Sequence, residues 1–267
     1  MEQLSQSIER IIEQAGGKWG ISIEELDTNN SWSLNEEELF YAVSIIKIPI
    51  MIAVFTAYEK EKLYLSDTLE LKVEEMVGGS GVLQHLSPGI KLTINDLITL
   101  MIIQSDNTAT NMLINLIEKK NIQQTMKDIG MQKSKFYNKL MTVPATLQGY
   151  NEITAQEVTM MLKKIATGKI ISRHACERML AIMKKQQLTD CLPAKLRQAD
   201  STIIGNIPEW QLANKTGFVS GMRHDIGIFY VGDRVMVTTV LSKGLDDNHS
   251  KDAIAKVGLE IYHYLKR

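Results

Sequence analysis

The stretch Ala42-Val43-Ser44-Ile45-Ile46-Lys47-Ile48-Pro49 places one hydroxyl and one amine three residues apart inside an otherwise apolar run. If a helix begins near Ser44, this spacing stacks the two side chains on one helix face, a turn apart. A serine hydroxyl becomes a nucleophile when a nearby base accepts its proton, and an amine walled in by isoleucines has a lowered pKa that suits it for this task. Alternatively, Ser44 caps a buried helix and Lys47 lies along its surface.

The residues before this stretch predict one helix followed by a β-hairpin. Apolar residues recur at helical spacing from Leu4 to Ala15, and Gly16-Gly17 ends the helix. Alternating apolar residues then predict strands at 19–23 and 31–34, joined by a turn at 27–30. The chain therefore reaches Ser44 from an antiparallel pair of strands.

The residues after it predict a block of helices and then a return to strands. The helix from Ser44 should run to about Lys60, with Pro49 bending its first turns. Further helices are expected at 93–104 and 154–168, each beginning with a capping box, over 109–117, and after residue 172. A surface turn is expected at 77–81 and a long loop at 131–151. Strands are expected at 211–215, 225–231 and 235–241, and a helix at 254–265.

This order of elements predicts a mixed α/β (α+β) fold. Both chain ends should meet in one five-stranded antiparallel sheet flanked by helices, with an all-helical domain inserted between its halves. We expect residues 1–42 and 197–267 to form the sheet domain and residues 43–196 the helical domain. The active site should then lie in the cleft between them.

Composition excludes several classes of function. The 267 residues are 44% hydrophobic, and 30 basic side chains balance 31 acidic ones to a net charge of -1, which argues against nucleic acid or an acidic membrane as the main partner. No apolar run is long enough to insert into a membrane. Cys176 and Cys191 are expected to be thiols, and the five histidines have no metal-ligand spacing, so we expect no metal or other cofactor.

We expect a monomer whose partner is a small-molecule substrate and not a nucleic acid or a membrane. The first residues lack the features of a signal peptide, so the chain as written is expected in the cytoplasm, or outside the cell if a leader was removed.

Two more polar motifs occur once each, Ser105-Asp106-Asn107 between two apolar helices and Lys215-Thr216-Gly217 at the end of a predicted strand. Together with Ser44-x-x-Lys47 they form, in this order, a signature of β-lactamases and penicillin-binding proteins. The chain resembles class A β-lactamases in particular. Family-like stretches extend over nearly its whole length, at 78–83, 92–97, 108–111 and 192–194.

The resemblance implies that Ser44 is acylated, with Lys47 beside it. It also implies that Ser105 and Lys215 assist proton transfer and bind the carboxylate of the substrate. These four residues are the expected catalytic residues.

Five further residues are implied to bind the substrate. Asn107 would hydrogen-bond a substrate amide and Thr216 its carboxylate, while Gly217 lets a substrate backbone approach. The backbone N–H groups of Phe218 and of the nucleophile would form the oxyanion hole. Arg223 sits where many family members keep a carboxylate-binding arginine, if one residue is deleted here.

One departure from the family concerns hydrolysis of the acyl-enzyme. The family's Glu-x-x-Leu-Asn segment, whose glutamate activates water, reads here Tyr137-Asn138-Lys139-Leu140-Met141. Loss of a general base typically costs 10²–10⁴-fold, so deacylation should be weak unless Glu152 replaces it. A peptidase acting on D-Ala-D-Ala-like ends, a cytoplasmic esterase or amidase, a binding or sensing module that stays acylated, and a scaffold with vestigial motifs are the alternatives.

Overall fold

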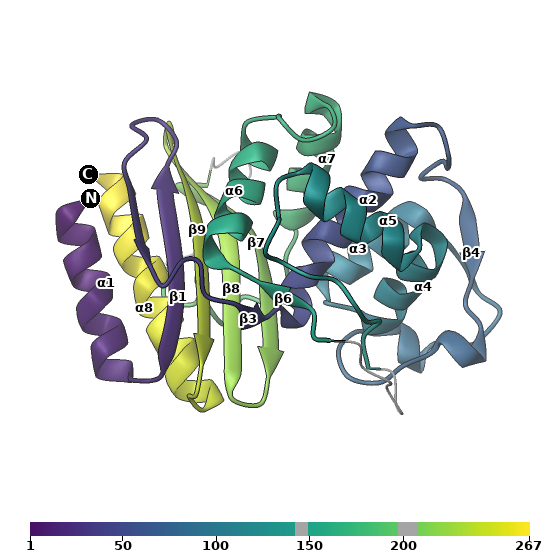
Figure 1. Cartoon of the computed structure of the whole chain (residues 1–267), viewed down its shortest axis with the longest axis horizontal. Helices are drawn as coiled ribbons and strands as arrows, with labels where there is room; N and C mark the ends of the chain where they lie inside the picture. Colours follow the sequence, from purple (N-terminus) through teal and green to yellow (C-terminus); the bar gives the residue numbers. More distant parts are fainter. Residues whose placement is uncertain (142–148, 197–207) are drawn as a thin grey trace.

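The computed structural model describes residues 1–141, 149–196 and 208–267. Its main element is a five-stranded antiparallel sheet with the strand order β2-β1-β9-β8-β7 (Figure 1). The strands are β1 (Lys18–Glu25), β2 (Ser31–Leu34), β7 (Trp210–Val219), β8 (Met222–Val231) and β9 (Arg234–Lys243). The prediction of one antiparallel sheet built from both chain ends is confirmed.

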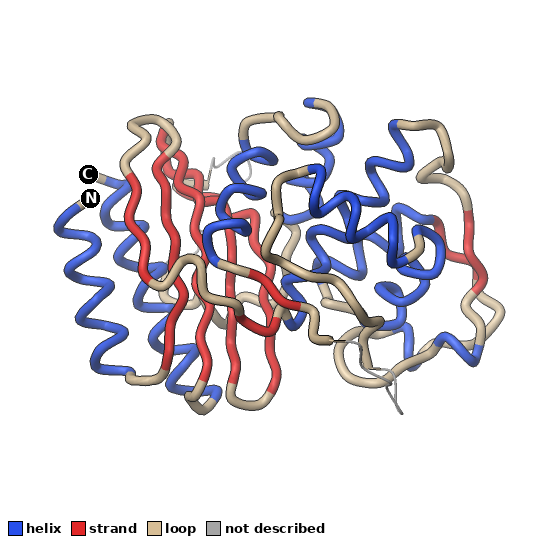
Figure 2. Tube along the Cα trace, in the orientation of Figure 1, coloured by secondary structure: helices blue, strands red, loops and turns tan. Residues whose placement is uncertain are grey.

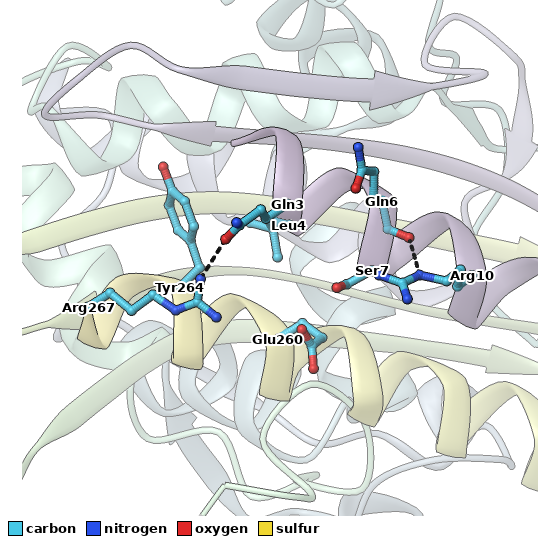
Figure 3. A pocket seen from close by; sticks show the side chains of 8 residues that line it. All are labelled: Gln3, Leu4, Gln6, Ser7, Arg10, Glu260, Tyr264 and Arg267. Carbon is cyan, nitrogen blue, oxygen red and sulfur yellow. Dashed lines mark hydrogen bonds between the residues drawn. The ribbon is translucent and has the colours of Figure 1, made fainter.

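Two terminal helices, α1 (Glu2–Ala15) and α8 (Asp247–Lys266), cover one face of this sheet (Figures 1 and 2). Their apolar stripes, which include Ile8 and Ile254, form one core with Ile21 and Val240 of the sheet. A hollow of about 300 Å³ lies between these helices, and Arg267 donates a hydrogen bond to Gln3 at its wall (Figure 3). The hollow lies on the sheet face away from the helical block.

The second core lies between the other sheet face and a block of helices. The helices are α2 (Lys47–Glu59), α3 (Ile94–Ile103), α4 (Asn107–Ile117), α5 (Lys119–Asp128), α6 (Ala155–Ala166) and α7 (Arg173–Met183). Residues 47–55 of α2 are all buried, so this helix is central to the block. Among the described residues, no helix has the length and apolar character needed to cross a bilayer.

Several short elements were not predicted from the sequence. They are α5, the strand pairs β3 (Phe40–Tyr41) with β6 (Glu152–Ile153) and β4 (Thr68–Glu70) with β5 (Lys91–Thr93), and the 3-10 turns at Val43–Ile46, Val73–Glu75 and Leu83–His85. The two-residue and three-residue strands are too short to show a period of two. The domain boundaries stay a prediction, and the one near residue 197 adjoins residues outside the described part of the chain.

Three predicted boundaries require correction. The α-helix begins at Lys47 rather than Ser44, after a 3-10 turn, so Pro49 lies in its first turn, where a missing N–H breaks no helical hydrogen bond. Strand β7 continues through the Lys-Thr-Gly motif to Val219, and β8 begins at Met222. The motif therefore lies inside a strand and not at its end.

The predicted capping boxes differ from each other in the structure. Thr93 and Asp96 form a complete one at the start of α3. Thr154 caps α6, but the carboxylate of Glu157 instead accepts hydrogen bonds from the backbone N–H groups of residues 132–134. Glu157 therefore fixes the beginning of the long loop, a tertiary role that its spacing from Thr154 did not indicate.

Candidate active site

The first two motifs meet at the amine of Lys47, which is completely buried. Its Nζ lies 2.6 Å from the backbone oxygen of Ser105, 3.0 Å from the Ser105 Oγ and 2.9 Å from the Asn107 Oδ1. Helix α2 thus holds its first residue directly against the turn that joins α3 to α4.

The third motif reaches the same hydroxyl from strand β7. The Nζ of Lys215, also completely buried, donates to the Ser105 Oγ at 3.1 Å and to the backbone oxygen of Thr216 at 2.8 Å. The Ser105 hydroxyl therefore lies between two lysine amines that are distant from it in sequence.

Burial lowers the pKa of both amines because water no longer solvates the charged form. The pKa of Lys47 is lowered well below its ordinary value by burial and by repulsion from Lys215, against the attraction of Asp106. Burial lowers the pKa of Lys215 to about 7, against the attraction of Asp225. Burial therefore disfavours the charged form of both amines.

A neutral Lys47 fits its three contacts well. A neutral amine has two N–H groups and one lone pair, so it can donate to the two carbonyl oxygens, of Ser105 and of the Asn107 side chain. Its lone pair can then accept the proton of a hydroxyl. In the part of the chain that the structure describes, no hydrogen bond or ion pair joins this amine to a carboxylate, so the arrangement can provide a base.

Ser44 lies in the 3-10 turn immediately before Lys47, and the Lys47 N–H donates to the Ser44 carbonyl oxygen. Three residues complete one turn of a 3-10 helix, so the side chains at positions 44 and 47 project from the same side. Ser44 is partly exposed while Lys47 is buried. Solvent therefore reaches residue 44 but not the amine of residue 47.

Strand β7 presses against this turn at Gly217. A Cβ at this position would lie 2.5 Å from the Val43 Cγ2 and 3.3 Å from the Ser44 nitrogen. Glycine is therefore needed for the backbone of the third motif to reach the turn. Val43 has a φ of 39°, a strained backbone conformation for a β-branched residue. Strain of this kind clusters at functional sites.

Asp106, the middle residue of the second motif, holds this part of the site in place. Its Oδ1 accepts from the Ala109 N–H at 2.9 Å and caps α4, while its Oδ2 accepts from the N–H groups of Val82 at 2.6 Å and Leu83 at 2.8 Å. A Cβ at Gly81, whose φ is +105°, would lie 2.3 Å from the Asp106 Cγ. The surface turn predicted at 77–81 is confirmed, but the sequence did not show that it packs against Asp106 of the second motif.

The remaining substrate-binding candidates lie on β7 and β8. Thr216 is buried, Phe218 is half exposed, and Phe218 pairs with Arg223 across the two strands. Side chains alternate along a strand, so Thr216, Phe218 and Arg223 share one face of the sheet. The Arg223 guanidinium is not open, because Asp190 holds its Nη2 at 2.5 Å. The structure therefore does not place Arg223 as the free carboxylate ligand that was expected.

The segment that replaces the family's Glu-x-x-Leu-Asn is held by amide side chains. The Leu140 N–H donates to the Asn111 Oδ1 at 2.9 Å, and the Asn111 Nδ2 donates to the Leu140 oxygen at 2.8 Å. Asn151 binds the N–H groups of Tyr137 and Asn138 in the same way. Part of the predicted loop, residues 142–148, lies outside the described residues.

Glu152 does not join the lysine cluster in the described part of the structure. It lies in β6, opposite Tyr41, and its backbone pairs with Lys135. Among the described residues, no hydrogen bond links its carboxylate to Ser44, Lys47 or Ser105. The alternative that Glu152 replaces the missing glutamate has no support from this geometry.

A helical block that carries two serines and a lysine, packed against a second lysine on the edge strand of an antiparallel sheet, defines the β-lactamase type of serine hydrolase fold. The chain belongs to the beta-lactamase enzyme family, whose model matches residues 3–265.

Individual relatives agree with this assignment. A beta-lactamase from Rhodobacter capsulatus is 26% identical over 231 residues, covering 85% of this chain and 75% of the relative. The crystal structure of a beta-lactamase from Sphaerobacter thermophilus superposes with a TM-score of 0.88 and 28% identity, over 98% of this chain and 96% of the other. A PBP-A mutant, solved as an acyl-enzyme complex with penicillin G, has a TM-score of 0.86 and 23% identity over 100% of this chain and 97% of its own. This last likeness concerns the fold alone.

Proposed function

We propose that this protein opens the amide bond of a β-lactam, or a related amide or ester, by forming an acyl-enzyme on Ser44, and that it hydrolyses this acyl-enzyme slowly. One observation carries the proposal: the Ser105 hydroxyl lies 3.0 Å from the Lys47 amine and 3.1 Å from the Lys215 amine, beside the turn that holds Ser44. The family, whose relatives are named beta-lactamases, supports the same reaction.

The proposed first step is acylation of Ser44, which requires two proton transfers, one from the Ser44 hydroxyl and one to the leaving nitrogen. The Ser44 Oγ bonds to the substrate carbonyl carbon, and its proton passes to the neutral Lys47 amine. The C–N bond then breaks, and the leaving nitrogen takes a proton from the Ser105 hydroxyl, which a lysine amine replenishes. Proton transfers of this kind typically contribute 10²–10⁴-fold each.

The second step, hydrolysis of the acyl-enzyme, lacks its expected base. Segment 137–141 contains no acid, and Glu152 has no contact with the lysine cluster among the described residues. This absence also favours a second candidate, a peptidase of the D-Ala-D-Ala type, and it favours a module that stays acylated. An esterase or amidase of the same mechanism is the remaining candidate.

Exposure to a fluorescent penicillin and to nitrocefin separates these functions. We expect stable label with little nitrocefin turnover; rapid turnover would contradict slow deacylation, and no label would remove β-lactams as substrates. Ser44→Ala should abolish labelling and Lys47→Ala should slow it by about 10²–10⁴-fold. Ser172→Ala, which removes the cap of α7 and an exposed hydrogen bond to Glu59, is the matched control and should label at the wild-type rate. Persistent labelling of the Ser44→Ala protein would exclude Ser44 as the nucleophile.

A further inference from the structure

The guanidinium of Arg223 is enclosed beside the Lys-Thr-Gly motif. Its Nη2 lies 2.5 Å from the Asp190 Oδ2, its Nε lies 3.5 Å from the Asp247 Oδ1, and its Cζ stands 4.8 Å above the Phe218 ring. Only 8% of the side chain is exposed. An incoming anion would have to pass the Phe218 ring and displace a carboxylate to reach this charge.

Lys251 links the two carboxylates into one charged cluster with Arg223. Its Nζ lies 2.9 Å from the Asp190 Oδ2 and 2.8 Å from the Asp247 Oδ2. Burial opposes ionisation of Asp190, but the hydrogen bond from Lys251 and the charge of Arg223 outweigh it and lower its pKa. Two cations and two anions therefore cancel, and the cluster offers no net positive charge to a ligand.

The cluster lies beside the Lys-Thr-Gly motif on the sheet face that α8 covers, and this motif is where the resemblance places the carboxylate of a substrate. Thr216 lies on the same sheet face as Arg223, two residues before Phe218, with which Arg223 pairs. The nearby cation is Lys215, whose amine donates to Ser105 and to the Thr216 backbone oxygen instead of pointing at open space. A substrate carboxylate at this motif would therefore find the guanidinium already paired with Asp190.

We propose that Asp190 determines substrate specificity, because it neutralises Arg223 and so favours amides and esters that carry no carboxylate beside the bond to be opened. This inference rests on the proposed function and narrows its substrate class. It predicts that removing the charge of Asp190 creates a preference for anionic substrates that the natural site lacks.

Benzylpenicillin and its methyl ester are suitable probes, since they differ in one charge at this position. Their dissociation constants are measured by titration calorimetry on full-length protein carrying Ser44→Ala, which prevents reaction. Adding Asp190→Asn, which keeps the shape and one acceptor oxygen, should shift the ratio of the two constants about tenfold in favour of the anion. Asp252→Asn removes an equal charge from the pairs with Lys195 and Lys256 and should leave the ratio unchanged.

A double substitution tests whether the gain passes through Arg223. Arg223→Gln combined with Asp190→Asn keeps the cluster neutral and should cancel the shift. An unchanged ratio in the Asp190→Asn protein, an equal shift with Asp252→Asn, or binding of neither probe would overturn the role of Asp190. Intact-mass measurement of acyl-Ser44 formation in proteins that retain Ser44 tests the proposed function separately, because it reports reaction and not the ratio of affinities.

Discussion

Replacing Gly217 by alanine should disable the site without removing any of its polar groups. The added Cβ would lie 2.5 Å from the Val43 Cγ2, about 1 Å short of the separation at which two carbon atoms attract each other. It would also lie 3.3 Å from the Ser44 nitrogen, so the turn that carries the nucleophile must move away from β7. A displacement of about 1 Å can cost on the order of 10²-fold in rate, and overpacking typically costs about 1–3 kcal/mol of stability.

Labelling rates with fluorescent penicillin and thermal unfolding measure the two effects. A second substitution, Val43→Ala, removes the methyl group that clashes, so the double variant should label within about fivefold of Val43→Ala alone. Gly232→Ala is the control: it adds a methyl into open space at a φ of +57°, and should cost about 1–2 kcal/mol without slowing labelling. Wild-type labelling by the Gly217→Ala protein, or no recovery in the double variant, would refute the steric argument.

Three other predictions concern pH, stability and turnover. Lys215 has a folded pKa of about 7, below the ordinary value of 10.5, so the folded protein binds fewer protons than the unfolded chain between these values and gains stability as the pH rises. Lys215→Met should therefore reduce the slope of the unfolding free energy against pH, measured by urea denaturation between pH 8 and 9, by about 1.4 kcal/mol per pH unit. An unchanged slope would show that the amine stays charged in the folded protein. Asp106→Ala removes the acceptor of three backbone N–H groups and should cost about 3 kcal/mol in the same assay. Asp96→Ala removes only the exposed capping-box bond from the Thr93 N–H and should cost about 1 kcal/mol, so equal losses would contradict the proposal that Asp106 holds the loop. Tyr137→Glu should speed release of the penicillin label by up to about 10²-fold while Glu152→Gln changes it less than twofold, and a large loss with Glu152→Gln would identify Glu152 as the base.

Periodicity and capping residues predicted the larger elements because their causes are local. The stripe from Leu4 to Ala15, the complete capping box at Thr93 and the alternation in β8 and β9 depend on neighbours a few residues away. Strand ends were predicted less well, since β7 gains its last residues by pairing with β8, and pairing is a property of two segments.

The amino-acid sequence by itself determined which hydroxyls and amines this protein can use, and through its resemblance it indicated the family. Only the tertiary structure decided which of these groups contact each other. Lys47 and Lys215 both form hydrogen bonds to the Ser105 hydroxyl, although they are 58 and 110 residues away from it in the sequence. Asp190 pairs with the Arg223 guanidinium, which the resemblance implied would bind a substrate carboxylate. The physical reason is that burial and charge neutralisation depend on every group that surrounds a side chain. Those groups come together only when the sheet and the helical block close on each other.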